Sequence, residues 1–277
     1  MNTLLLAELQ SQEKDLLQTL VLLEETVFQG SFYVSHINDQ EHQFSFDGLE
    51  LVIEQCQAVI AEIDSSLVQA ETLMNELYYQ HLFIDNYKTP WPVSAFQVAT
   101  SLNQRLMSPI VKAVLVCEIL SACGFDADLV FVPNKVMVRL CCDEQYAIIF
   151  DAVTGESLDW HELDLRLEEL DGDPSQHEFP SMNRRAILAE YLTGLKSALI
   201  REKAFEQALL CVDLLLSLNP DDPLERRDRG FLLHQLDCFK VAVDDYRYFV
   251  EKCPKDPAAQ LLKIQLDNIT LSDPTFH

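Results

Sequence analysis

The chain has 277 residues, of which 45 are acidic and 20 basic, so its formal net charge at pH 7 is −25. Such an acidic surface repels phosphate groups, and we therefore expect neither nucleic acid nor an anionic membrane as a partner. With 48% apolar and 23% charged residues the composition is that of a globular protein, and its seven glycines favour helix over loop.

Residues 1–90 are predicted to form amphipathic helices over 3–28, 49–63 and 67–83, because their apolar residues recur at helical spacing. This region carries 15 acidic and 2 basic residues. One explanation for this acidic excess is that the acidic residues form the solvated faces of the helices. The other is that they form a docking surface for a basic partner. The start of the chain lacks the basic region of a signal peptide, so we expect a cytoplasmic protein.

Residues 93–106 are predicted to be helical. The segment Arg105–Leu158 is predicted to contain one helix followed by three short strands. Ser108 and Pro109 suit the start of the helix, since serine caps and proline is accepted in the first turn. Gly124 suits its end. Residues 128–133, 136–142 and 146–150 are rich in β-formers and separated by turns, which predicts an antiparallel meander. The expected fold class is α+β, mostly α.

This order of elements resembles the transglutaminase-like core. In that core a cysteine at a helix N-terminus is the nucleophile, a histidine on a strand is the base, and an aspartate orients the histidine. The nucleophile position falls here on Pro109, with Ser108 beside it, the base position on Lys135 and the orienting position on Asp151. The resemblance therefore implies a degenerate site that lacks the Cys-His-Asp triad.

Two interpretations of Lys135 are open at this point. In the first, Lys135 pairs with Asp151 across neighbouring strands and holds the old site closed. In the second, burial lowers its pKa, so that it activates Ser108 in a hydrolase or acyltransferase. The second interpretation requires Ser108 to be free of a capping role.

The cysteines and histidines do not predict a metal site. Cys117 and Cys123 lie on different faces of one helix, while the adjacent Cys141 and Cys142 point to opposite sides of a strand. No histidine stands at ligand spacing from either pair. We expect reduced thiols, no metal and no cofactor.

The last third of the chain repeats with a period of 34 residues. Ala208 and Ala242 are 34 apart, as are Pro220 and Pro254. This spacing is that of the tetratricopeptide repeat, with small residues where two helices cross. It predicts helices over 185–201, 204–217, 224–236, 239–251 and 257–270. The last is expected to be a capping helix, because Leu261, Leu262, Ile264 and Leu266 need cover. The expected domains are a transglutaminase-like domain over 1–170, a linker over 171–184, and two repeats with a capping helix over 185–277.

Three arginines gather at the start of the second repeat, at Arg226, Arg227 and Arg229. Ion pairs along a solvated face explain them in one interpretation. In the other they bind a carboxylate, since the guanidinium fork accepts a carboxylate through two hydrogen bonds. The sequence leaves both interpretations open.

Three segments carry a resemblance to the SirB-type family of bacterial proteins, namely FVPNKVMVRL, FDAVTGESL and NPDDPLERRDRGFLLHQLDCFKVAVDDYRYFVEKCPKDP. Members of that family join a transglutaminase-like region to tetratricopeptide repeats. The resemblance implies a non-catalytic protein that binds another protein or peptide through its repeats. A hydrolase using the remodelled site and a structural or chaperone-like subunit are the alternatives, and the sequence does not define an oligomeric state.

Overall fold

The computed structural model describes residues 15–28, 39–81, 83, 90–132, 135–143, 146–157 and 180–272. The chain divides into two compact units, Met1–Tyr191 and Leu192–His277. The first unit contains mostly helices and one small antiparallel sheet, and the second contains only helices in its described residues, so the expected fold class is confirmed. The last residue of the first predicted strand, Pro133, lies outside the described residues, as do residues 171–179 of the predicted linker.

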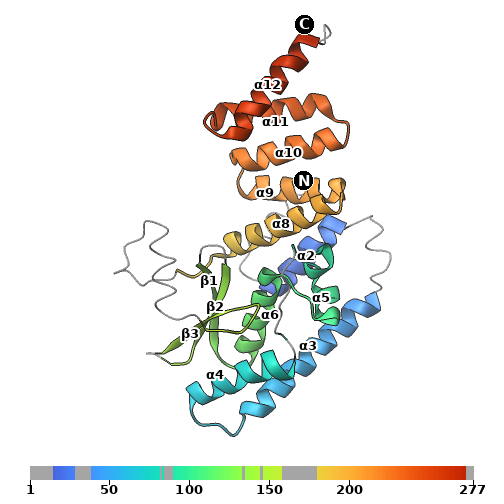
Figure 1. Ribbon diagram of the computed structural model, residues 1–277. Helices are drawn as coiled ribbons and strands as arrows, with labels where there is room; N and C mark the ends of the chain where they lie inside the picture. Colours follow the sequence, from blue (N-terminus) through green and yellow to red (C-terminus); the bar gives the residue numbers. More distant parts are fainter. Residues whose placement is uncertain are drawn as a thin grey trace. The chain divides into compact units, whose positions relative to one another are not determined.

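The centre of the first unit is α6, Pro109–Ala122, which is apolar on all sides. Nine of its side chains are buried, and a helix that is hydrophobic all round belongs in a core. It contacts α2 (Leu16–Phe28), α3 (Asp39–Ile60) and the sheet, and it lies between the sheet and α2 in Figure 1. The helix ends as predicted at Gly124, whose φ of 89° places it in the left-handed region.

Four further elements belong to the helical part of the first unit. Helix α4, Ser66–Asn75, continues into a π-helical turn, η2, over Glu76–Gln80. A 3₁₀ turn, η3 (Val93–Ala95), precedes α5 (Val98–Gln104). The sequence predicted one helix over 93–106, and this prediction is wrong because the backbone becomes extended at Gln97.

The sheet is the predicted antiparallel meander with strand order β1-β2-β3. Its strands are β1 (Asp126–Val132), β2 (Lys135–Cys141) and β3 (Ala147–Asp151). Asp128 pairs with Arg139, and Met137 pairs with Asp151. Because alternate residues of a strand share a face, Lys135, Arg139, Asp128 and Asp151 all lie on one side of the sheet.

The second unit begins inside α8 (Arg184–Arg201) and continues through α9 (Phe205–Leu218), α10 (Pro223–Gln235), α11 (Phe239–Lys252) and α12 (Pro257–Ser272). Successive helices stack in chain order (Figure 1). Helices α9 and α11 begin 34 residues apart, as do α10 and α12. The predicted repeat period is therefore the period of the structure.

Helix α12 covers α11 with Leu262 and Leu266, which pack around Tyr246. The sequence predicted that Leu261 and Ile264 would also be covered. Instead they are 65% and 61% exposed, so α12 presents apolar side chains on two faces.

Candidate functional site

Lys135 and Asp151 form an ion pair across β2 and β3. The Lys135 Nζ lies 3.0 Å from the Asp151 Oδ2, and the two side chains are 34% and 13% exposed. The other carboxylate oxygen of Asp151 accepts a hydrogen bond of 2.8 Å from the backbone N–H of Val153. The residue at the base position therefore donates to the residue at the orienting position, and an ammonium group has no lone pair with which to accept a proton.

Ser108 occupies the N-cap position of α6, followed by Pro109 in the first turn as predicted. Its side chain makes no capping hydrogen bond, which corrects the expectation that the serine caps the helix. The hydroxyl is buried and has no partner among the described residues, and the whole residue is 0% exposed. A nucleophile must reach its substrate. Because the Ser108 hydroxyl is buried, a substrate cannot reach it in this conformation.

Lys112, in the second turn of α6, is a buried residue whose importance the sequence analysis missed. It is 0% exposed, and its Nζ donates to the backbone carbonyl oxygens of Phe83 (2.8 Å) and Val153 (3.5 Å). It thus ties the start of α6 to the chain just after Asp151. The signal was a lone cation in the apolar run PIVKAVLV, because a charge inside a core requires partners.

A second ion pair occupies the same side of the sheet. The Arg139 guanidinium donates to both carboxylate oxygens of Asp128, at 2.8 and 2.5 Å, and also to the hydroxyl of Ser181. The backbone of Met182 donates to Leu129 at the edge of β1. These contacts fix residues 181–182 to the sheet.

The turn after β3 is held against η2. The Tyr78 hydroxyl donates to the carbonyl oxygen of Ala152 (2.8 Å), and its ring meets the edge of Phe150. Gly155 has a φ of 75°, and a Cβ there would lie 2.6 Å from the Tyr78 ring. Glycine is required at this position for both its backbone angle and the close approach.

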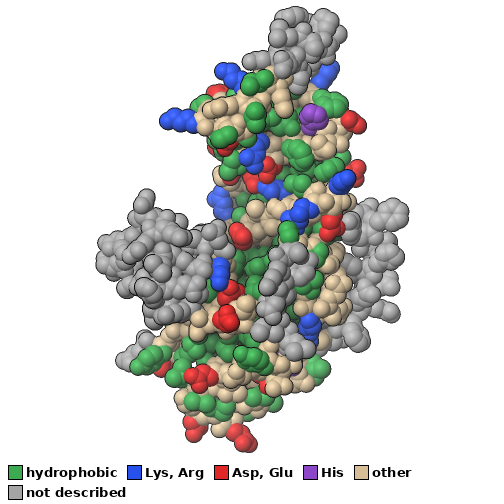
Figure 2. Space-filling model, in the orientation of Figure 1, with side chains coloured by type: hydrophobic (Ala, Val, Ile, Leu, Met, Phe, Trp, Pro, Cys, Tyr) green, Lys and Arg blue, Asp and Glu red, His purple; other side chains and the backbone are tan. Residues whose placement is uncertain are grey.

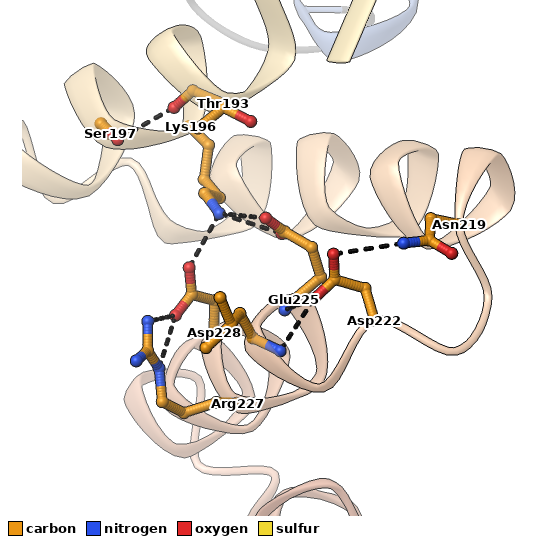
Figure 3. Close-up of polar contacts among 9 residues, drawn as sticks. Thr193, Lys196, Ser197, Asn219, Asp222, Glu225, Arg227 and Asp228 are labelled. Carbon is orange, nitrogen blue, oxygen red and sulfur yellow. Dashed lines mark hydrogen bonds and ion pairs between the residues drawn. The ribbon is translucent and has the colours of Figure 1, made fainter. Parts of the chain in front are cut away.

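In the repeats, Lys196 is the most deeply buried cation. Its Nζ lies 2.7 Å from Glu225 and 2.8 Å from Asp228, both on α10 (Figure 3). Burial alone would lower the pKa of this lysine, but the two carboxylates outweigh burial and raise it. Lys196 is therefore held as a cation and connects α8 to α10.

The three arginines of α10 are ion-paired inside the second unit. Arg229 donates to both oxygens of Asp245 on α11, each at 2.7 Å, and Arg226 approaches the same carboxylate at 3.2 Å. Arg227 pairs with the adjacent Asp228. Asp245 is 2% exposed. The carboxylate that Arg226 and Arg229 bind is therefore a buried side chain of the same chain.

Glu24, on α2, was also missed by the sequence analysis. It is 2% exposed, and its Oε2 accepts a hydrogen bond of 2.8 Å from the backbone N–H of Val98 at the start of α5. Burial raises its pKa to about 7. The signal was its position four residues after Leu20, on the apolar side of α2.

No group of three potential metal ligands occurs within the ranges that the structure describes, and all eight cysteines are free thiols. In the same ranges, no helix is both long and apolar enough to cross a membrane.

Comparison with known families places the chain in a class. The family described as the transglutaminase-like superfamily matches residues 46–193, and a tetratricopeptide-repeat family matches residues 195–267. The chain belongs to the transglutaminase-like superfamily, with tetratricopeptide repeats at its C-terminal end.

The resemblance to the SirB-type family is confirmed. Protein SirB1 of Salmonella typhimurium is 28% identical over 85% of this chain and 88% of its own length. The UPF0162 protein of Vibrio cholerae is 28% identical over 87% and 92%, and the UPF0162 protein YchA of Escherichia coli is 29% identical over 86% and 90%. No solved structure matches the chain significantly.

Proposed function

We propose that this protein acts by binding another protein through its repeats, and that its transglutaminase-like site is not catalytic. The observation that carries the proposal is the ion pair of Lys135 with Asp151, which engages the base and orienting positions with each other. The complete burial of Ser108 supports it as well. The charge and composition suit a cytoplasmic protein.

The exposed face of α10 is the candidate binding face. Leu224 and Phe231 are seven residues apart, so they share one face of the helix, and they are 47% and 39% exposed. Arg227 lies between them, 35% exposed, with its guanidinium over the ring of Phe249. Exposed apolar side chains around an arginine suit a peptide with apolar residues beside a carboxylate.

The test is quantitative recovery of partner proteins by the tagged full chain. The double variant Leu224→Asp with Phe231→Asp should lose more than about tenfold of partner recovery, a change of about 1.4 kcal/mol in binding. Leu210→Asp is the matched control, since Leu210 is 41% exposed but lies on α9. Equal recovery by the wild type and a folded double variant would contradict the proposal.

The competing candidate is a serine hydrolase or acyltransferase, which the unpartnered hydroxyl of Ser108 favours. A fluorophosphonate probe labels activated serines and tests this directly. We expect no labelling of the folded chain, because Ser108 is buried. Labelling that disappears in Ser108→Ala would establish the enzyme instead. If the protein is instead a structural or chaperone-like subunit, its partners should be recovered in stoichiometric amounts. Substitutions on the α10 face should then leave that recovery unchanged.

A further inference from the structure

The described side chains of α3, α4 and η2 include acidic residues and no lysine or arginine. Residues 15–87 contain 13 acidic residues and no lysine or arginine. In Figure 2 the lowest part of the molecule, over α4, shows acidic and hydrophobic side chains, and one basic side chain lies above it, over the region of α3 and α5. Such a field attracts cationic segments and raises their association rate.

Helix α4 and η2 present apolar side chains within this acidic surface. Leu67, Val68 and Tyr79 are 40%, 45% and 66% exposed. Val68 and Tyr79 are eleven residues apart, three helical turns, and Glu71 and Asn75 are exposed between them. This exposed face of α4 and η2 therefore combines apolar and acidic character.

The same face borders a groove of about 490 Å³ between η2 and the turn after β3. One wall comes from α4 and η2, and the other comes from the turn that begins at Thr154. The lining residues are Met74, Asn75, Tyr78, Tyr79, Thr154, Gly155, Glu156 and Ser157. The Tyr78 ring is fixed by its hydroxyl contact to Ala152 and by Gly155, so this part of the groove is preformed.

The lining defines the chemistry of the occupant. The exposed ring of Tyr79 and the exposed carboxylate of Glu156 are the groups that receive a lysine ammonium or an arginine guanidinium. Within the described ranges no lysine or arginine pairs with the exposed carboxylate of Glu156. The exposed Leu67 and Val68, further along α4 from the groove, suit apolar residues elsewhere in the same segment.

We propose that this groove binds a lysine or arginine side chain from a basic, partly apolar segment of a partner protein. This surface is separate from the repeat face of the proposed function and does not depend on it. A partner bound here would be recognised by its positive charge, whereas the face of α10 suits a carboxylate.

The test uses a synthetic amphipathic Lys/Leu peptide that carries a benzophenone cross-linker, with a Glu/Leu peptide of the same length for comparison. The full chain should bind the Lys/Leu peptide saturably, and cross-links should fall within residues 67–79 and 154–157. Glu156→Gln and Tyr79→Ala should each weaken binding about fivefold or more. Asp244→Asn, an equal charge change at an exposed site on α11, should weaken it less than twofold.

Three results would overturn the proposal. They are an absence of binding, cross-links that map to other surfaces, and equal weakening by Glu156→Gln and Asp244→Asn. The last result would mean that the peptide responds only to net charge. Both groove residues are exposed, so the variants retain the fold, and a thermal melt verifies this in each case.

Discussion

At the scale of single residues, the positions of the proposed degenerate site are engaged in other contacts or buried. Lys135 is paired with Asp151, and Ser108 is sealed in the core beside Pro109. The ion pair of Lys135 with Asp151 across neighbouring strands was one of the two interpretations that the sequence left open. The sequence did not predict the contacts of Lys112. Nothing in the neighbouring sequence shows that its ammonium group reaches the backbone carbonyl oxygens of Phe83 and Val153.

Glu24 makes the stability of the protein depend on pH. Burial raises its pKa from 4.5 to about 7, so the folded chain retains a proton that the unfolded chain releases. The stabilisation is fully present below about pH 4.5 and is lost as pH rises through 7, an effect of about 3 kcal/mol. Urea unfolding of Glu24→Gln between about pH 5 and pH 8 should lack this loss. An unchanged pH profile would show that Glu24 is not the titrating group.

At the scale of elements, the sequence pattern of the repeats predicted the positions of the repeat helices well, because prolines and small residues recur in each helix pair. The predicted helix over 93–106 failed for a long-range reason. The backbone N–H of Val98 donates a hydrogen bond to the carboxylate of Glu24, which lies 74 residues earlier in the chain. Because this N–H is not bonded within a helix that continues from residue 93, α5 begins as a separate helix after Gln97. The start of α3 at Asp39 was missed because residues 39–48 are mostly polar and show no apolar residues at helical spacing.

The contact of α10 with α11 depends on Asp245. Removing its charge in Asp245→Asn would leave Arg226 and Arg229 without their carboxylate, and breaking a buried pair costs about 3 kcal/mol or more. The neighbouring Asp244 is 79% exposed, and Asp244→Asn should cost about 0–1 kcal/mol. Chemical denaturation measures both. Equal effects would mean that the network contributes little.

Gly230 allows α10 and α11 to approach closely. A Cβ at this position would lie 2.8 Å from the Tyr246 ring, so Gly230→Ala should destabilise the protein by about 1–3 kcal/mol despite its better helix propensity. Gly48, in α3, has open space around its Cβ position, and Gly48→Ala should stabilise by about 0.5–1 kcal/mol. Thermal melts that show both variants stabilised would contradict this close packing.

At the scale of the whole molecule, the chain joins a member of the transglutaminase-like superfamily to tetratricopeptide repeats. Sequence reasoning reached both parts because each has a strong local signature, the strand meander and the period of 34. The sequence could not predict the groove beside η2, because Tyr78 and Gly155 are far apart in the chain and come into contact only in the folded protein.

The measurement that tests the central claim most directly is partner recovery by the full-length double variant Ser108→Ala with Lys135→Met. This variant removes the hydroxyl and the amine of the old site and leaves the α10 face intact. If the protein acts by binding, the folded variant should recover partners within about twofold of the wild type, a difference below about 0.5 kcal/mol. A folded variant that no longer recovers its partners, or that fails to replace the wild-type chain in cells, would contradict the account.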